Sequence, residues 1–251
     1  MAGRTRSLAM LAASARPALT TVSSPASVLD FWFAGAWGTP AMGNIRAPPL
    51  VAQMPLWFGV GSAAVKAAMD AECRERAGLI RAAGRSELNS AEWCSSDGLY
   101  AQMLLCDQLA RNAFRGTPEA FEYDQRGMAM ARELVEAGCH LDQEMAYYFF
   151  LCTPGQHSEQ PADHAFNGRI VDYLRTTRYP PTAGAEAAAH VEEISQSVLS
   201  HMAVIDRFGR YPHRNAALGR HTTSEEEVWL ADDDNLPGWA KSQIKPPVAE
   251  S

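Results

Sequence analysis

Long hydrophobic runs are missing from this sequence. No apolar segment approaches the roughly 18 residues that suggest a membrane-spanning helix, although 47% of the 251 residues are hydrophobic, an ordinary share for a globular protein. Positive charge is in deficit as well, because the formal net charge is −7 at pH 7. We therefore expect neither a membrane nor a nucleic acid as a partner, although a local basic patch could still face an anion.

Paired cysteine motifs are also absent. The chain has five cysteines, an odd number, and none of them belongs to a CxxC pair. Several, among them Cys106 and Cys152, lie in apolar stretches that favour helices. This pattern is typical of buried free thiols rather than of disulfides or a metal site, and it fits a reducing compartment.

Acidic residues do not occur before Asp30, in a segment that holds Arg4, Arg6 and Arg16 among many Ser, Thr and Ala. Such a start is typical of an organelle transit peptide, most simply a mitochondrial one. The alternative is a disordered extension on a cytoplasmic protein. We assign residues 1–24 to this transit peptide or disordered leader, 25–240 to a single all-helical domain, and 241–251 to a disordered tail.

Alternation of polar and apolar residues with a period of two is absent over any useful length, so strands are not expected. We predict an all-α fold of six to eight helices paired by short loops, with a Gly- and Pro-rich loop over 34–50. The expected helices cover parts of 24–33, 62–83, 95–114, 115–138, 142–152, 158–177, 185–208 and 222–232, the last being the final helix. Thr117 is the expected N-cap of the helix within 115–138.

The first polar motif is CDQLARNAFRGTP, residues 106–118. Within a helix, Asp107, Arg111 and Arg115 follow one another every four residues, and Gln108 and Asn112 form a parallel pair beside them. Such a ladder is usually a solvated face that stabilises the helix slightly. Side chains that can orient one another also suit a binding site.

The second motif is TPGQHSEQ, residues 153–160. A Pro-Gly break places His157, Ser158 and Glu159 at the start of a helix, with Ser158 as its N-cap. The backbone N–H groups there would attract an anion, and Glu159 could pair with an arginine. His157 and Glu159 could instead bind a metal together with a later histidine, although their spacing matches no standard metal signature.

The third motif is RFGRYPHRN, residues 207–215, and the basic stretch continues to residue 221. Its polar members are Arg207, Arg210, His213, Arg214, Asn215 and Arg220. The preceding helix should end at Gly209 as its C-cap, and Pro212 prevents its continuation. The arginines then project from a turn, where they can converge on a carboxylate or phosphate. Alternatively, they bind helix carbonyls and acids of neighbouring helices.

His201 is the exception on the helix that precedes this motif. It lies on an apolar stripe that contains Val198 and Ile205, and a buried histidine needs partners for both ring nitrogens. A satisfied core histidine is the ordinary explanation. Its position two turns before the basic stretch also makes it a candidate site residue.

The segments LLCDQLARNAFRGTPEAFEYD, TPGQHSE and RFGRYPHRNAALGRHTTSEEEVWL, preceded by VLDFWF, together resemble the domain-of-unknown-function 924 family over about residues 27–235. The resemblance implies an all-helical, tetratricopeptide-repeat-like fold of stacked antiparallel helix pairs, and it implies no reaction. Departures from the family pattern, such as Cys106 and Tyr211, affect packing around the motifs and leave the polar residues in place.

We expect a small-molecule site that binds a carboxylate or phosphate in the hollow of the helical stack, with or without acid–base catalysis. The candidate acids and bases are His157, Glu159, His201 and His213. The candidate ligand-binding residues are Asp107, Gln108, Arg111, Asn112, Arg115, Arg207, Arg210, Arg214, Asn215 and Arg220. The sequence identifies no cofactor and contains no nucleophile elbow, phosphate-binding glycine loop or dinucleotide fingerprint.

Two alternatives to a small-molecule site remain open. A tetratricopeptide-like groove lined by arginines would suit an acidic peptide. A purely structural network would lock helix ends together, and removing one member of a buried pair would then be costly.

Overall fold

The computed structural model describes residues 24–244, and every regular element within that range is helical. The α-helices are α1 (Pro25–Phe33), α2 (Met54–Phe58), α3 (Ala63–Arg74), α4 (Ala77–Gly84), α5 (Ser96–Leu104), α6 (Ala110–Ala113), α7 (Glu119–Glu122), α8 (Asp124–Glu136), α9 (Met145–Leu151), α10 (Thr153–His157), α11 (Pro161–Tyr173), α12 (Ala185–Phe208), α13 (Asn215–Leu218), α14 (Ser224–Leu230) and α15 (Gly238–Gln243). Short 3₁₀ turns are η1 (Pro40–Gly43), η2 (Leu50–Gln53), η5 (Pro181–Ala183) and η6 (Pro212–Arg214), and π-helical turns are η3 (Leu105–Leu109) and η4 (Leu174–Arg178).

The expected all-α class is confirmed, while the tetratricopeptide-like arrangement of the pairs stays a prediction. Six to eight helices is too few for residues 24–244, because several expected helices are interrupted. The helix expected over 62–83 divides into α3 and α4, and the one over 115–138 divides at Tyr123 into α7 and α8. Thr117 is not an N-cap, since its hydroxyl donates to the carbonyl of Phe114 and α7 begins two residues later.

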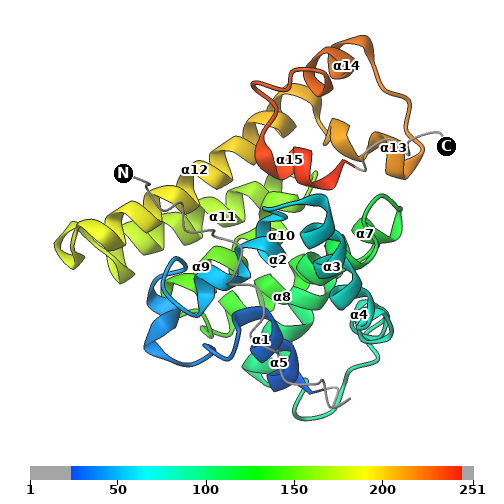
Figure 1. The fold of residues 1–251 in the computed structure, drawn as a ribbon. Coiled ribbons are helices and arrows are strands. Elements are labelled where there is room, and N and C mark those ends of the chain that lie inside the picture. The colour runs from blue at the N-terminus through cyan, green and yellow to red at the C-terminus, as the bar shows by residue number, and fades with distance from the viewer. Residues whose placement is uncertain (1–23, 245–251) are drawn as a thin grey trace, which may run out of the picture.

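The body of the molecule is built around α5 and α8, which pack on each other, with α1 against α5 (Figure 1). α1 begins with a capping box between Ser24 and Ser27, and Pro25 needs no hydrogen-bond donor in the first turn. It buries Trp32 and Phe33 completely. Together with rings from α2, α5 and α9 they form an aromatic core, which supports the elements of the candidate site.

The segment around His157 differs from the expectation. Thr153, Pro154 and Gly155 form the first turn of α10 and not a loop between helices. Pro154 is tolerated there because the first turn of a helix needs no N–H donor at that position. Ser158 is therefore the C-cap of α10 rather than an N-cap, and α11 begins only at Pro161. The Ser158 hydroxyl accepts from the Gln160 amide at 3.1 Å and donates to the Asp163 carboxylate.

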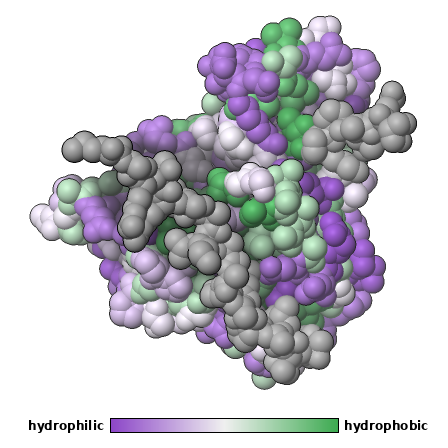
Figure 2. Space-filling model, viewed as in Figure 1, coloured by the Kyte–Doolittle hydropathy of each residue, from purple (hydrophilic) through white to green (hydrophobic). Residues whose placement is uncertain are grey.

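The C-terminal helices gather at one end of α12 (Figure 1). α12 ends as expected at Gly209, whose φ of 68° is the left-handed conformation that glycine favours. α14 is not the last helix, because α15 follows it and continues past the domain boundary expected at residue 240. Figure 2 shows hydrophobic residues at the surface where these helices meet the body. The leader assigned to residues 1–24 falls almost entirely outside the described residues, as does the tail beyond residue 244.

None of the helices within residues 24–244 combines the length and the apolar character needed to cross a membrane.

We predict that Gly155→Ala destabilises the protein by about 1–3 kcal/mol, the usual cost of overpacking a core. A Cβ at this position would lie 2.5 Å from Oδ1 of the buried Asn167, which holds α10 to α11 by donating to the Cys152 carbonyl. The free energy of unfolding in urea measures the effect. Gly168→Ala on α11 is the control, because its Cβ would meet nothing within 4 Å, and it should leave stability unchanged or slightly higher. Equal stability of both variants would contradict the close approach.

Candidate functional site

A cavity of about 440 Å³ opens where the C-terminal helices meet the body. Its wall comes from α2, η3, α6, α9, α10, α12, η6 and α15, which are distant in sequence. Seven predicted site residues lie on it: Gln108, Arg111, Asn112, His157, His201, His213 and Arg214. The cavity is within the size range of small-molecule sites.

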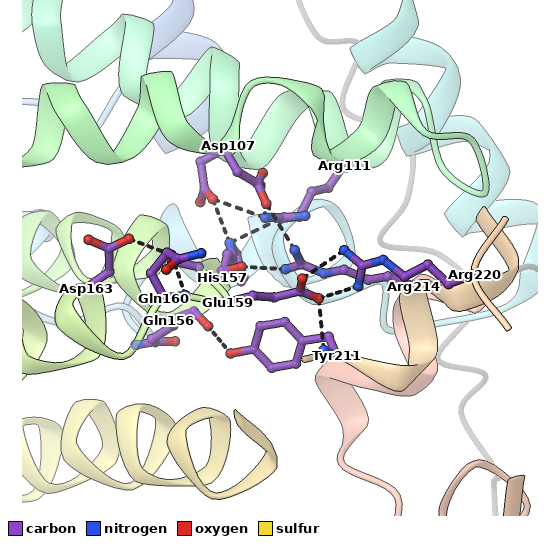
Figure 3. A network of polar contacts seen from close by, with 12 residues as sticks. Asp107, Arg111, Gln156, His157, Glu159, Gln160, Asp163, Tyr211, Arg214 and Arg220 are labelled. Carbon is purple, nitrogen blue, oxygen red and sulfur yellow. Dashed lines mark hydrogen bonds and ion pairs between the residues drawn. The ribbon is translucent and has the colours of Figure 1, made fainter. Parts of the chain in front are cut away.

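The carboxylate of Asp107 lies behind this wall and is fully buried. It contacts Nδ1 of His157 at 2.7 Å and Nη2 of Arg111 at 3.4 Å (Figure 3). It also accepts a hydrogen bond from Nε2 of Gln108 at 2.6 Å. Burial raises the pKa of Asp107, but His157 and Arg111 lower it by more, and the result is below the usual range of a carboxyl group. Asp107 is therefore ionised at neutral pH.

The π-helical turn η3 carries Asp107 and Gln108 and joins α5 to α6. The sequence predicts one regular helix through this region, in which Asp107 and Arg111 would be ordinary neighbours one turn apart. A π turn adds a residue to the helical ladder and is often found at functional sites. Here both Asp107 and Arg111 are buried and joined to residues of other helices rather than exposed on a solvated face.

The imidazole of His157 is oriented by its contact with Asp107. Nε of Arg111 also directs its N–H at Nδ1 of His157 from 3.1 Å, a contact that requires an unprotonated Nδ1. The Asp107 carboxylate is closer, at 2.7 Å, and because it is ionised it can only accept. We assign the proton to Nδ1, where it is donated to the closer Asp107 carboxylate. Burial and the charge of Arg111 lower the pKa of His157 despite the opposing effect of Asp107. The ring is therefore neutral at pH 7, with the unprotonated Nε2 on its other edge.

Two arginines share the carboxylate of Asp124. Nη2 of Arg111 donates to its Oδ1 at 2.9 Å, and Nη1 of Arg214 donates to its Oδ2 at 3.1 Å. Arg214 also donates to the carbonyl of His157 at 2.6 Å, while its buried Nε has no partner among the described residues. Burial lowers the pKa of Arg214, and the charge of Arg111 lowers it further. Asp124 is not among the predicted site residues, because the helix predicted within 115–138 places it in the helix interior, where an acidic residue is ordinarily exposed to solvent.

Two further histidines line the cavity beside His157. Nδ1 of His201 contacts the carbonyl of Ser197 at 2.8 Å, its ring stacks on Trp239 with centroids 4.0 Å apart, and the His157 ring is 5.8 Å away. Burial lowers the pKa of His201 well below the usual range, and His157 lowers it further. For His213, burial and then Arg214 lower the pKa in the same direction. All three rings are therefore neutral at pH 7.

The other arginines of the motifs lie outside the cavity wall, each in an ion pair. Arg115 binds Asp70, Arg207 binds Glu225, Arg210 binds Glu226 and Arg220 binds Glu159, with closest distances of 2.8, 2.9, 2.7 and 2.8 Å. Glu225 and Glu226 of α14 thus pair with arginines of the basic stretch, which has no acidic residues of its own. Asn215 also serves this cluster by donating to Glu226 at 3.1 Å.

Glu159 is separated from the histidines of the cavity. Its carboxylate accepts two hydrogen bonds from Arg220 at 2.8 Å and one from the Tyr211 amide at 2.9 Å (Figure 3). It lines a second hollow on the other side of Arg214. Within residues 24–244, no group of three His, Cys, Asp or Glu side chains is placed to hold a metal ion, so the metal alternative built on His157 and Glu159 finds no support in this geometry.

Aromatic residues form much of the remaining wall and were missed as site residues. They are Trp57, Phe58, Phe149, Phe150, Tyr211 and Trp239. In the sequence, such residues at helical spacing are indistinguishable from core residues. Only the tertiary arrangement shows that these residues line a cavity.

Comparison with known proteins connects this arrangement to a family. The family model described as "Bacterial protein of unknown function (DUF924)" matches residues 28–234. A solved structure of a protein of unknown function from Agrobacterium tumefaciens, ATU0120, is 29% identical; the match covers 83% of this chain and 97% of that one, with a TM-score of 0.56. No curated protein matches. The family match ends before α15 begins at Gly238.

We predict that Asp107→Asn lowers the free energy of unfolding by about 3 kcal/mol. This is the lower end of the range for breaking a buried ion pair, because Arg111 would still be paired with Asp124. In the wild-type protein this stabilisation is complete above about pH 4, the unfolded-state pKa of an aspartate. It is lost as the pH falls through the lower pKa of the folded state. Urea titrations at pH 7 and at acidic pH measure both effects.

The control is Glu225→Gln, which removes the carboxylate of an exposed ion pair with Arg207. Exposed pairs contribute little, so this variant should unfold like the wild type. If Asp107→Asn were equally harmless, the buried contacts of Asp107 would not hold the site together.

Proposed function

We propose that this chain binds a small anionic molecule in the cavity and uses His157 for proton transfer. The chain belongs to the DUF924 family of bacterial proteins of unknown function. The observation that carries the proposal is the pair formed by Asp107 and His157 at the cavity wall, with Nδ1 and Oδ1 2.7 Å apart. A peptide-binding role is the alternative, but a concave cavity of about 440 Å³ suits a small molecule better than an extended peptide.

His157 is suited to act as a general base. Its lowered pKa leaves the ring neutral at pH 7, and Asp107 holds the Nδ1 proton, so that Nε2 is the nitrogen available on the edge that reaches the cavity. When Nε2 accepts a proton, the buried carboxylate stabilises the imidazolium that forms, while Asp107 itself stays ionised. The same ring can return the proton as a general acid.

The guanidinium groups of Arg111 and Arg214 are suited to hold the anionic group. Both line the cavity beside His157, and both are buried. Burial lowers the pKa of Arg214 and the charge of Arg111 lowers it further, and a bound anion would oppose both effects by stabilising the charged guanidinium. The buried Nε of Arg214 is a hydrogen-bond donor without a partner among the described residues, which is costly unless a ligand or water accepts from it.

The anion-binding role of Arg214 predicts that Arg214→Gln weakens binding of acetate and inorganic phosphate at least tenfold. Isothermal titration calorimetry of the full chain measures the affinity, and circular dichroism checks that the variant is folded. Arg207→Gln is the matched control, because Arg207 is a motif arginine paired with Glu225 outside the cavity. Binding that is equally weakened in both variants, or in neither, would contradict a specific anion site.

The proposed base predicts that diethylpyrocarbonate, which acylates neutral accessible imidazoles, modifies His157 ahead of the more buried His201 and His213. The His157 side chain is 18% exposed, whereas His201 is only 3% exposed as a residue. Peptide mapping by mass spectrometry after brief treatment at pH 7 identifies the modified ring, with exposed His221 as the internal standard for full reactivity. Acetate should protect His157 and leave His221 unprotected. An unreactive His157 would argue against an available Nε2.

A further inference from the structure

The cavity has two chemically different sides. The polar side carries Arg111, Arg214 and His157. An apolar side is formed by α2 and α9, which contribute Trp57 and Phe58, and Phe149 and Phe150. A ligand that fills the cavity must therefore satisfy two kinds of surface at once.

The four rings of the apolar side form one continuous surface. Trp57 contacts Phe58 and Phe150 with centroids 6.2 and 5.0 Å apart, and Phe149 contacts Phe58 and Phe150 with centroids 5.7 and 5.1 Å apart. Edge-to-face contacts of this kind present flat faces to a neighbouring group. The adjoining Val60 extends the same wall.

Part of this aromatic surface is open to solvent. Phe58 is 38% exposed and Val60 is 49% exposed, although both lie beside fully packed core residues. Exposed apolar groups that adjoin a cavity gain free energy when a ligand removes them from water. The ligand therefore has an apolar part, flat or slender enough to lie along the rings.

The polar side limits the charge of the ligand. Arg111 and Arg214 bring two positive charges, and the carboxylates of Asp107 and Asp124 that bind them bring two negative charges. Because His157, His201 and His213 have lowered pKa values, they add no charge at neutral pH. A group with one negative charge disturbs this balance less than a dianion such as a phosphate monoester, and burying uncompensated charge is costly.

We infer that the ligand is an amphipathic monocarboxylate, whose carboxylate lies at Arg111 and Arg214 and whose aromatic or short hydrocarbon part lies against Phe58 and Phe149. This inference deepens the proposed anion site and rests on it. The stacked rings of Trp239 and His201 line the same cavity and add aromatic surface to its wall.

The test compares four probes by isothermal titration calorimetry with the full chain: 3-phenylpropionate, acetate, 3-phenylpropanol and phenyl phosphate. We expect 3-phenylpropionate to bind at least tenfold more tightly than each of the others, since acetate lacks the ring, the alcohol lacks the charge and phenyl phosphate carries a second charge. Acetate that binds as tightly as 3-phenylpropionate would overturn the inferred class and leave the anion site standing. An equally tight alcohol or phosphate ester would overturn it as well, and so would the absence of binding by all four.

Variants separate the two halves of the inference. Phe58→Ala should weaken binding of 3-phenylpropionate at least threefold and leave acetate unchanged. Leu199→Ala is the control, because Leu199 is 46% exposed but does not line the cavity, and it should change neither affinity. Arg214→Gln should weaken both acids. If Phe58→Ala weakened binding of 3-phenylpropionate and Arg214→Gln did not, the proposed anion site would be wrong, while the apolar surface would still bind the ring. If only Arg214→Gln weakened binding, the anion site would stand and the amphipathic class of ligand would be wrong.

Discussion

The buried carboxylate of Asp107 joins two of the three sequence motifs from which the candidate site is built. It lies in the π turn η3 and reaches across to His157 at the end of α10, while Arg111 on α6 bridges from it to Asp124 at the start of α8. A charge without access to water must have partners, so this carboxylate requires η3, α6 and α10 to keep their positions. It also decides the tautomer of His157, and with it the only proton-transfer chemistry that the proposed function uses.

The arginines of the C-terminal basic stretch pair with acids in three places, one of which is Glu159, the partner of Arg220. Arg207 and Arg210 pair with Glu225 and Glu226, acids in the first turn of α14, and Arg210 thereby holds that helix against the end of α12. Arg214 alone turns inward to Asp124 and the cavity. An acidic protein thus concentrates arginine here largely to attach its last helices, and these attachments place Arg214 and the His213 ring at the cavity wall. Structural and binding roles belong to different arginines of one motif.

Much of the fold could be predicted from the sequence because its signals are local. The absence of strands from residues 24–244 follows from the absence of alternation, and the end of α12 at Gly209 follows from a glycine that precedes a Pro-containing turn. The interruptions could not be predicted, since they depend on contacts between distant residues. Gly155 lies within α10 instead of breaking a helix. The side chain of Asn167 occupies the space that a Cβ at this position would need. Thr117 and Ser158, both good N-cap residues by type, bind other groups once the helices are packed.

The sequence by itself determined that the chain is helical, that three polar motifs carry its unusual chemistry, and that these motifs follow the pattern of one family. Residue type and spacing along a helix are sufficient for those conclusions. Only the tertiary structure decided that Asp107 meets His157, that Glu159 is taken by Arg220, and that Trp57 and Trp239 face a cavity. The physical reason is that an ion pair or a cavity wall requires two surfaces to meet. The sequence shows which side chains are able to pair, but the packing of helices far apart in the chain selects the partners.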